Sequence, residues 1–168
     1  SITRVGVGAF SWCESLTSID IPDSVTSISD LAFEYCISLK SINIPEGVTK
    51  INTGTFSSCW NIEMVVLPNG ITEIGTSAFN QCLNLRSINI PHGVTKIGAG
   101  AFMYCPCLKT LTIPESVTDI GFCALGIRRN SINTLKVPKN SDISNLFFDE
   151  GKIVTAVPDK KGKKYHFE

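Results

Sequence analysis

The sequence predicts a repeat solenoid, in which short strands of successive units pair in parallel. Three observations predict this fold: the prolines, the phenylalanines and the cysteines each recur with a period of 23 residues. A fixed period over consecutive copies is typical of proteins that stack one supersecondary unit. The periodic positions are Pro22, Pro45, Pro68, Pro91 and Pro114; Phe10, Phe33, Phe56, Phe79 and Phe102; and Cys13, Cys36, Cys59, Cys82 and Cys105.

The first part of each unit is predicted to be a strand. One unit reads L-x-x-I-x-I-P-x-x-V-T-x-I-x-x-x-A-F-x-x-C-x-x, and in residues 39–45 ("LKSINIP") apolar residues alternate with a polar one near the end. Proline then ends the strand, because it cannot donate a hydrogen bond to a neighbour. The copies begin at Leu16, Leu39, Ile62, Leu85 and Leu108, and again at Ile132 after one extra residue.

The second part of the unit is predicted to return the chain to the start of the next strand. Residues 46–51 ("EGVTKI") indicate a turn and a short extended piece, with Val48 and Ile51 facing inward. Residues 52–59 ("NTGTFSSC") indicate a single helical or 3₁₀ turn. One unit cannot bury its apolar residues alone, so stacked units bury them against one another.

The cysteine column is predicted to be a column of small buried hydrophobic residues. Seven cysteines cannot all pair within one chain. Stacked copies have parallel Cα–Cβ vectors, which do not suit a disulfide, and a spacing of 23 residues does not suit a metal site. Cys107 and Cys123 lie outside the column, and we interpret them as incidental thiols.

Composition and motifs exclude several classes of function. Fifteen basic residues balance fifteen acidic ones, and no apolar run approaches the roughly 18 residues of a spanning helix. The sequence therefore predicts neither nucleic-acid binding nor membrane insertion. No nucleophile elbow, phosphate loop or zinc motif occurs, and His92 falls in a column of varied turn residues. We therefore predict no catalytic, cofactor-binding or metal-binding residues.

The unit resembles the BspA-like subclass of leucine-rich repeats, most clearly at residues 78–98, "AFNQCLNLRSINIPHGVTKIG". The resemblance covers residues 1 to about 143. It implies a right-handed superhelix with parallel strands on the concave face, and short extended segments and 3₁₀ or helical turns opposite. It also implies a cell-surface or secreted protein that adheres to host extracellular or surface proteins.

The repeat pattern divides the chain into two parts. Residues 1–143 are predicted to form the solenoid, which starts in the middle of a repeat and resembles an excised fragment. In residues 144–168 the cysteine column is lost, and the pattern indicates a strand, a turn at residues 149–151, a second strand and a polar turn. This segment is predicted to be hairpin-like, either covering the last repeat or interrupting it before another strand begins.

The outward positions of the predicted strands offer a candidate protein-binding face. These positions are mostly small and polar, but Met64 and Val66 place two apolar side chains on one central strand. An apolar centre with a polar rim is typical of a protein-binding patch, and Lys40, Glu63 and Arg86 supply charges beside it. The alternative is drift of the repeat, since "IEMVVLP" is its least regular copy.

The leading hypothesis is a non-enzymatic protein-interaction module from a surface or secreted adhesin. The alternative is a structural spacer that projects other domains and has no ligand of its own. An enzyme would need a site built by other parts of a longer protein, because the repeat loops are too short to form a pocket. The sequence identifies neither the ligand nor the oligomeric state.

Overall fold

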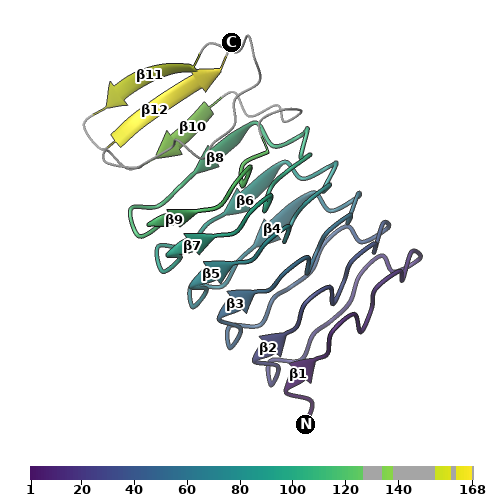
Figure 1. Cartoon of the computed structure of the whole chain (residues 1–168). Helices are drawn as coiled ribbons and strands as arrows, with labels where there is room; N and C mark the ends of the chain where they lie inside the picture. The colour runs from purple at the N-terminus through teal and green to yellow at the C-terminus, as the bar shows by residue number, and fades with distance from the viewer. Residues whose placement is uncertain (127–133, 138–153, 160–161, 168) are drawn as a thin grey trace.

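The computed structural model describes residues 1–126, 134–137, 154–159 and 162–167, and shows a stack of coils (Figure 1). Parallel strand pairs join residues one repeat apart, as in Lys50 with Glu73 and Met64 with Ser87. The predicted parallel pairing of equivalent strands is therefore confirmed. After the one-residue insertion the offset grows by one, so Thr134 pairs with Thr110.

The strands of the coils form two rows. One row holds the two-residue strands β1 (Arg4–Val5), β2 (Ser27–Ile28), β3 (Lys50–Ile51), β5 (Glu73–Ile74), β7 (Lys96–Ile97) and β9 (Asp119–Ile120). The other row holds β4 (Met64–Val66), β6 (Ser87–Asn89), β8 (Thr110–Thr112) and β10 (Thr134–Val137). We call the solvent side of β4, β6 and β8 the strand face.

The second row is shorter than the sequence predicts. Residues 17–20 form no strand, and residues 40–43 contribute only an isolated parallel bridge from Asn43 to Val66. The backbone still follows the same course, because the amide of Lys40 donates to the carbonyl of Thr17 and that of Glu63 to Lys40. Regular pairing on this row thus begins at β4.

The core is built from the apolar columns of the repeat. Val48 and Ile51, predicted to face inward, are 1% and 0% exposed. Phe33, Phe56, Phe79 and Phe102 are fully buried and stack face to face, with successive ring centroids 5.5 Å apart. The repeat period therefore places like residues on like residues along one continuous core.

The predicted helical or 3₁₀ turn before the cysteine is wrong, because the described residues contain no helix. Alternate amides in this segment bond within the coil and to the next coil, whereas a helix would use them all internally. Within one coil, the amides of Thr55, Ser57 and Cys59 donate to the carbonyls of Asn52, Gly54 and Phe56, respectively. Between coils, the amides of Gly54, Phe56 and Ser58 donate to the carbonyls of Thr76, Ala78 and Asn80, respectively.

An antiparallel hairpin extends the second row. Strand β12 (Gly162–Phe167) pairs with β10, and β11 (Val154–Asp159) pairs with β12, both antiparallel. Strand β11 overlaps the second strand predicted for the C-terminal segment, while the division of the chain into two parts stays a prediction. The predicted strand at 145–148, the turn at 149–151 and the boundary after residue 143 lie outside the described residues.

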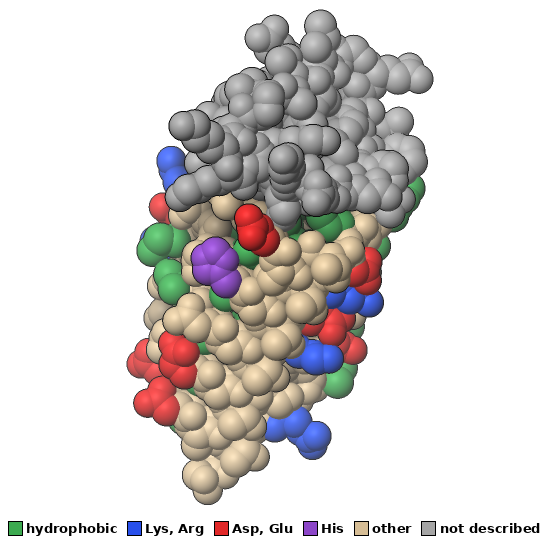
Figure 2. All heavy atoms as spheres, turned by 90° about the vertical axis from the view of Figure 1, so that its left-hand side faces the viewer, with side chains coloured by type: hydrophobic (Ala, Val, Ile, Leu, Met, Phe, Trp, Pro, Cys, Tyr) green, Lys and Arg blue, Asp and Glu red, His purple; other side chains and the backbone are tan. Residues whose placement is uncertain are grey.

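The outward side chains of the first row form a ladder of opposite charges. Lys50 lies 3.0 Å from Glu73, and Lys96 lies 4.0 Å from Glu73 and 3.7 Å from Asp119. Figure 2 shows acidic and basic side chains alternating along one flank of the molecule. These pairs are solvent-exposed, so each contributes little to the free energy of unfolding.

Candidate interaction surface

Met64 and Val66 occupy the two outward positions of β4. Their exposed fractions are 57% and 60%, whereas Val65 between them is 1% exposed. This alternation follows from the pleat of a strand, whose successive side chains point to opposite faces. The prediction that Met64 and Val66 face solvent is confirmed, while their role in binding stays a prediction.

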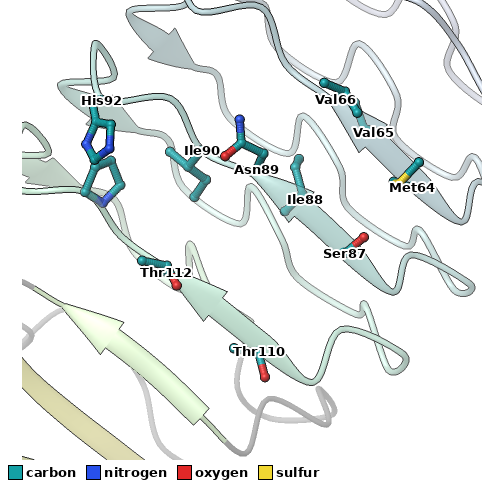
Figure 3. A pocket seen from close by; sticks show the side chains of 11 residues that line it. Met64, Val65, Val66, Ser87, Ile88, Asn89, Ile90, His92, Thr110 and Thr112 are labelled. Carbon is teal, nitrogen blue, oxygen red and sulfur yellow. The ribbon is translucent and has the colours of Figure 1, made fainter.

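A shallow hollow of about 400 Å³ lies on the strand face beside these two side chains. Figure 3 shows Met64 and Val66 on one strand, with Ser87 and Asn89 on the next strand and Thr110 and Thr112 beyond them. The hollow thus spans three neighbouring coils. Its lining is Met64, Val65, Val66, Ser87, Ile88, Asn89, Ile90, His92, Thr110, Thr112 and Pro114.

The predicted charged residues lie in one column next to Met64. Lys40, Glu63 and Arg86 are exposed, and backbone hydrogen bonds join them in order across adjacent coils. Nε of Arg86 lies 3.9 Å from Oε2 of Glu63, with both side chains more than half exposed. A pair of this kind orients a partner more than it adds affinity.

Sequence reasoning missed part of the hollow. His92 was interpreted as a solvated turn residue, and it is exposed, but it also lines the hollow beyond the end of β6 (Figure 3). Ile88 packs against the core, but it is partly exposed and also lines the hollow. No motif in the sequence marks either residue, because the hollow arises between coils.

The strand face offers little for catalysis or metal binding. Threonine, serine, asparagine and one histidine, His92, supply the polar side chains of the hollow, and no group of three metal-ligating residues occurs anywhere in the described part of the chain. The described residues also contain no helix long and apolar enough to cross a membrane. The arrangement suits non-covalent binding of an extended or flat partner.

The column cysteines are packed against the preceding coil. Sγ of Cys36, Cys59, Cys82 and Cys105 donates to the carbonyl oxygen of the phenylalanine in that coil, at 3.1–3.3 Å. These four residues are buried, as predicted. The prediction for Cys13 is wrong, because Cys13 is exposed in the described structure.

Burial makes these four thiols hard to ionise. Desolvation raises the pKa of Cys36 to about 11 and that of Cys105 to about 12. Desolvation also raises the pKa of Cys59 and of Cys82, with a further contribution from neighbouring column cysteines. Since the thiolate is the nucleophile, we expect these four thiols to react slowly at neutral pH.

These raised pKa values predict a loss of stability at alkaline pH. Above the ordinary thiol pKa of about 8.5, the unfolded chain releases protons that the folded column retains. The free energy of unfolding should then fall by about 1.4 kcal/mol per pH unit for each ionising thiol. Urea unfolding at pH 8 and pH 10, with a reductant present, measures this slope.

The matched control for this slope is the double variant Cys59→Ala/Cys82→Ala, which keeps every other titrating group. Its stability should fall less steeply between the two pH values than that of the parent. Equal slopes would show that the column does not couple folding to thiol ionisation.

Comparisons with known proteins agree with this architecture. A family model described as the BspA type leucine rich repeat region matches residues 3–130 in six copies. A search of curated proteins finds no match.

Three similar crystal structures are bacterial proteins. A leucine-rich repeat protein from Eubacterium ventriosum is 31% identical with a TM-score of 0.71, over 82% of this chain and 36% of that one. The pneumococcal vaccine antigen PcpA is 26% identical with a TM-score of 0.64, over 86% and 37%. A leucine rich cell surface protein from Faecalibacterium prausnitzii is 24% identical with a TM-score of 0.61, over 97% and 48%. The chain therefore spans less than half of each of these structures.

Proposed function

Because the chain belongs to the BspA-type leucine-rich repeat family, we propose that it is a non-enzymatic protein-interaction module of a cell-surface or secreted protein. Its proposed role is adhesion to a host extracellular or surface protein through the strand face. Two of the similar structures, a cell surface protein and a vaccine antigen, support an exposed location by their descriptions.

The observation that carries this proposal is the apolar centre of the strand face. Met64 and Val66 are more than half exposed although the equivalent positions in neighbouring coils are polar, as in Ser87 and Asn89. When a partner fully buries an exposed side chain of this size, the free energy of binding becomes more favourable by roughly 1.5–3 kcal/mol. Threonine and asparagine around the hollow supply a polar rim that can hydrogen-bond to the partner's backbone.

The alternative is a structural spacer, in which the coils only separate other domains. Drift of the "IEMVVLP" repeat would then account for Met64 and Val66. The two functions differ in one measurable property, because a spacer has no saturable ligand.

We expect the double variant Met64→Ser/Val66→Asn to bind extracellular-matrix proteins at least about tenfold more weakly than the parent, since two buried apolar contacts are lost. Surface plasmon resonance against immobilised fibronectin, fibrinogen, laminin and collagen measures this change. Both side chains point away from the core, so the melting temperature should stay the same.

The matched control is Val7→Ser, which also removes an apolar side chain, 72% exposed, away from the strand face. It should bind like the parent. Equal binding by the double variant and the parent at equal melting temperature would reject the strand face, and no saturable binding by the parent would favour the spacer.

A further inference from the structure

One of the turns that follow the periodic prolines differs in sequence from all the others. In this turn the amide of Ile71 donates to the carbonyl of Pro68 at 3.2 Å, and the two residues between them are Asn69 and Gly70. Asparagine followed by glycine occurs nowhere else in the sequence. The equivalent pairs in the other coils are Asp23 with Ser24, Glu46 with Gly47, His92 with Gly93, and Glu115 with Ser116.

An asparagine side chain can react with the backbone that follows it. The amide nitrogen of the next residue loses its proton and attacks Cγ of the asparagine, which closes a five-membered succinimide ring. A C–N bond forms, the bond from Cγ to Nδ2 breaks, and ammonia leaves with the proton. Glycine at the next position makes this attack easiest, because it has no Cβ to crowd the nitrogen and its backbone reaches many conformations.

The fold leaves the reacting groups of this turn accessible. Asn69 and Gly70 are both exposed. Among the described residues, neither the backbone amide of Asn69 nor that of Gly70 donates a hydrogen bond, and the Asn69 side chain makes none. A Cβ built on Gly70 would come no closer than 3.6 Å, to the carbonyl oxygen of Glu46, so the turn has room to move. The Gly70 nitrogen can therefore attack without first giving up a hydrogen bond of its own.

The other asparagines of residues 1–126 are held by the fold. Nδ2 of Asn52 donates to the carbonyl of Ile28 at 2.6 Å, and Nδ2 of Asn84 donates to Oδ1 of Asn61 at 3.0 Å. The others lie on a strand ladder or have a buried side-chain oxygen: Asn43, Asn80 and Asn89. Each of these asparagines is followed by threonine, isoleucine, leucine or glutamine, whose side chain crowds the amide nitrogen. Both sequence and structure therefore single out Asn69.

We propose that Asn69 is a modification site, at which the folded chain converts asparagine to aspartate and isoaspartate through a succinimide. Water opens the ring on either side. Attack at Cγ breaks its bond to the Gly70 nitrogen and gives aspartate. Attack at the backbone carbonyl carbon of Asn69 breaks the original peptide bond and leaves the chain running through the side chain, as isoaspartate. Either route consumes one water molecule and releases one ammonia, with no oxidation or reduction.

The modification changes the charge beside the hollow of the strand face. Asn69 and His92 hold the same turn position in adjacent coils, and His92 lines the hollow (Figure 3). A carboxylate at residue 69 therefore takes the turn position between those of Glu46 and His92. Isoaspartate also adds a methylene group to the backbone between β4 and β5. These changes occur whether or not the hollow binds a protein, so the inference does not rest on the proposed function.

The test follows the folded full chain during incubation for several weeks. The formal net charge of the chain is zero, so each conversion gives a more acidic species that anion-exchange chromatography separates. Peptide mapping by mass spectrometry assigns the residue, and electron-transfer fragmentation distinguishes isoaspartate from aspartate. We expect both products at residue 69, formed faster at pH 9 than at pH 6, because the attacking amide must lose its proton.

Two variants test the assigned atoms. Gly70→Ala keeps Asn69 but places a Cβ beside the attacking nitrogen, and it should slow the conversion about tenfold. Asn69→Gln keeps a side-chain amide but would have to close a six-membered ring, so it should give no product at residue 69 over the same period. The second variant also serves if Gly70→Ala does not fold, and circular dichroism verifies that each protein stays folded throughout.

Several outcomes would overturn the proposal. Asparagine that stays intact at residue 69 would show that the folded turn prevents the attack. Aspartate without isoaspartate would indicate direct hydrolysis of the side chain and no succinimide. Equal rates for folded Gly70→Ala and the parent would show that the Gly70 nitrogen is not the nucleophile. Equal conversion at Asn52 or Asn84 would show that this turn does not select the site.

Discussion

Replacing Phe79 with alanine is expected to lower the free energy of unfolding by about 3–5 kcal/mol. The Phe79 ring is 0% exposed and stacks between Phe56 and Phe102, with centroids 5.5 Å away on each side. Alanine removes the contacts with both neighbouring coils and leaves a cavity that the stack cannot close. Because each coil contacts only its neighbours, the coils on either side should then melt separately.

Thermal unfolding followed by circular dichroism measures this effect. The control Val7→Ala truncates an exposed side chain and should change stability by no more than about 0.5 kcal/mol. A single transition for Phe79→Ala, at the parent temperature, would show that the stacked rings do not hold adjacent coils together.

Gly98→Ala should also destabilise the fold strongly, by about 3 kcal/mol. A Cβ at residue 98 would lie 2.6 Å from the carbonyl carbon of Gly75 and would also collide with the backbone nitrogen of Thr76. Both groups are backbone of the adjacent coil, so no side-chain rotation relieves the clash and the coils must separate locally. Urea unfolding gives the difference in free energy.

Gly70→Ala is the matched control, because it makes the same substitution where space exists. A Cβ there would come no closer than 3.6 Å, to the carbonyl oxygen of Glu46. This variant should be neutral or slightly stabilising, since alanine restricts the unfolded chain. If both variants lose the same stability, the close approach of coils at Gly98 is not the cause.

Much of the fold could be predicted because the repeat period alone indicates which residues of adjacent coils lie side by side. A period of 23 residues predicts that Lys50 lies beside Glu73 and Ile51 beside Ile74, and both pairs occur. The same period predicts which residues face inward, because a column that is apolar in every copy has only the core to occupy.

The turn before the cysteine could not be predicted from the local sequence. In "NTGTFSSC" the small residues and the aromatic residue are compatible with a helical turn. The outcome depends on the next coil, which accepts the amides of Gly54, Phe56 and Ser58 through its own carbonyls. The sequence of one repeat does not indicate whether an amide will bond to a carbonyl of its own coil or to a carbonyl of the next coil.

The candidate site was predictable only at positions where its residue type differs from that of the equivalent residues in the other repeats. Met64 and Val66 stand out against polar residues in the other copies, so their exposure could be predicted from the repeat alone. His92 and Pro114 could not be linked to them, because they meet across coils at the ends of β6 and β8. The exposure of Cys13 was missed because the repeat assigns the same environment to every member of a column, and the other four members are buried.

The alternation of amides within and between coils has a mechanical consequence. Coils joined only to their neighbours behave as links in series, so a tension along the stack is the same at every interface, and the weakest one opens first. The first two coils share the short pairing of β1 with β2 and have no strand at residues 17–20. A coil pulled free releases 23 residues, which lengthens the molecule by roughly 70–80 Å at full extension. We therefore expect a stack pulled at its two ends to lengthen one coil at a time rather than all at once.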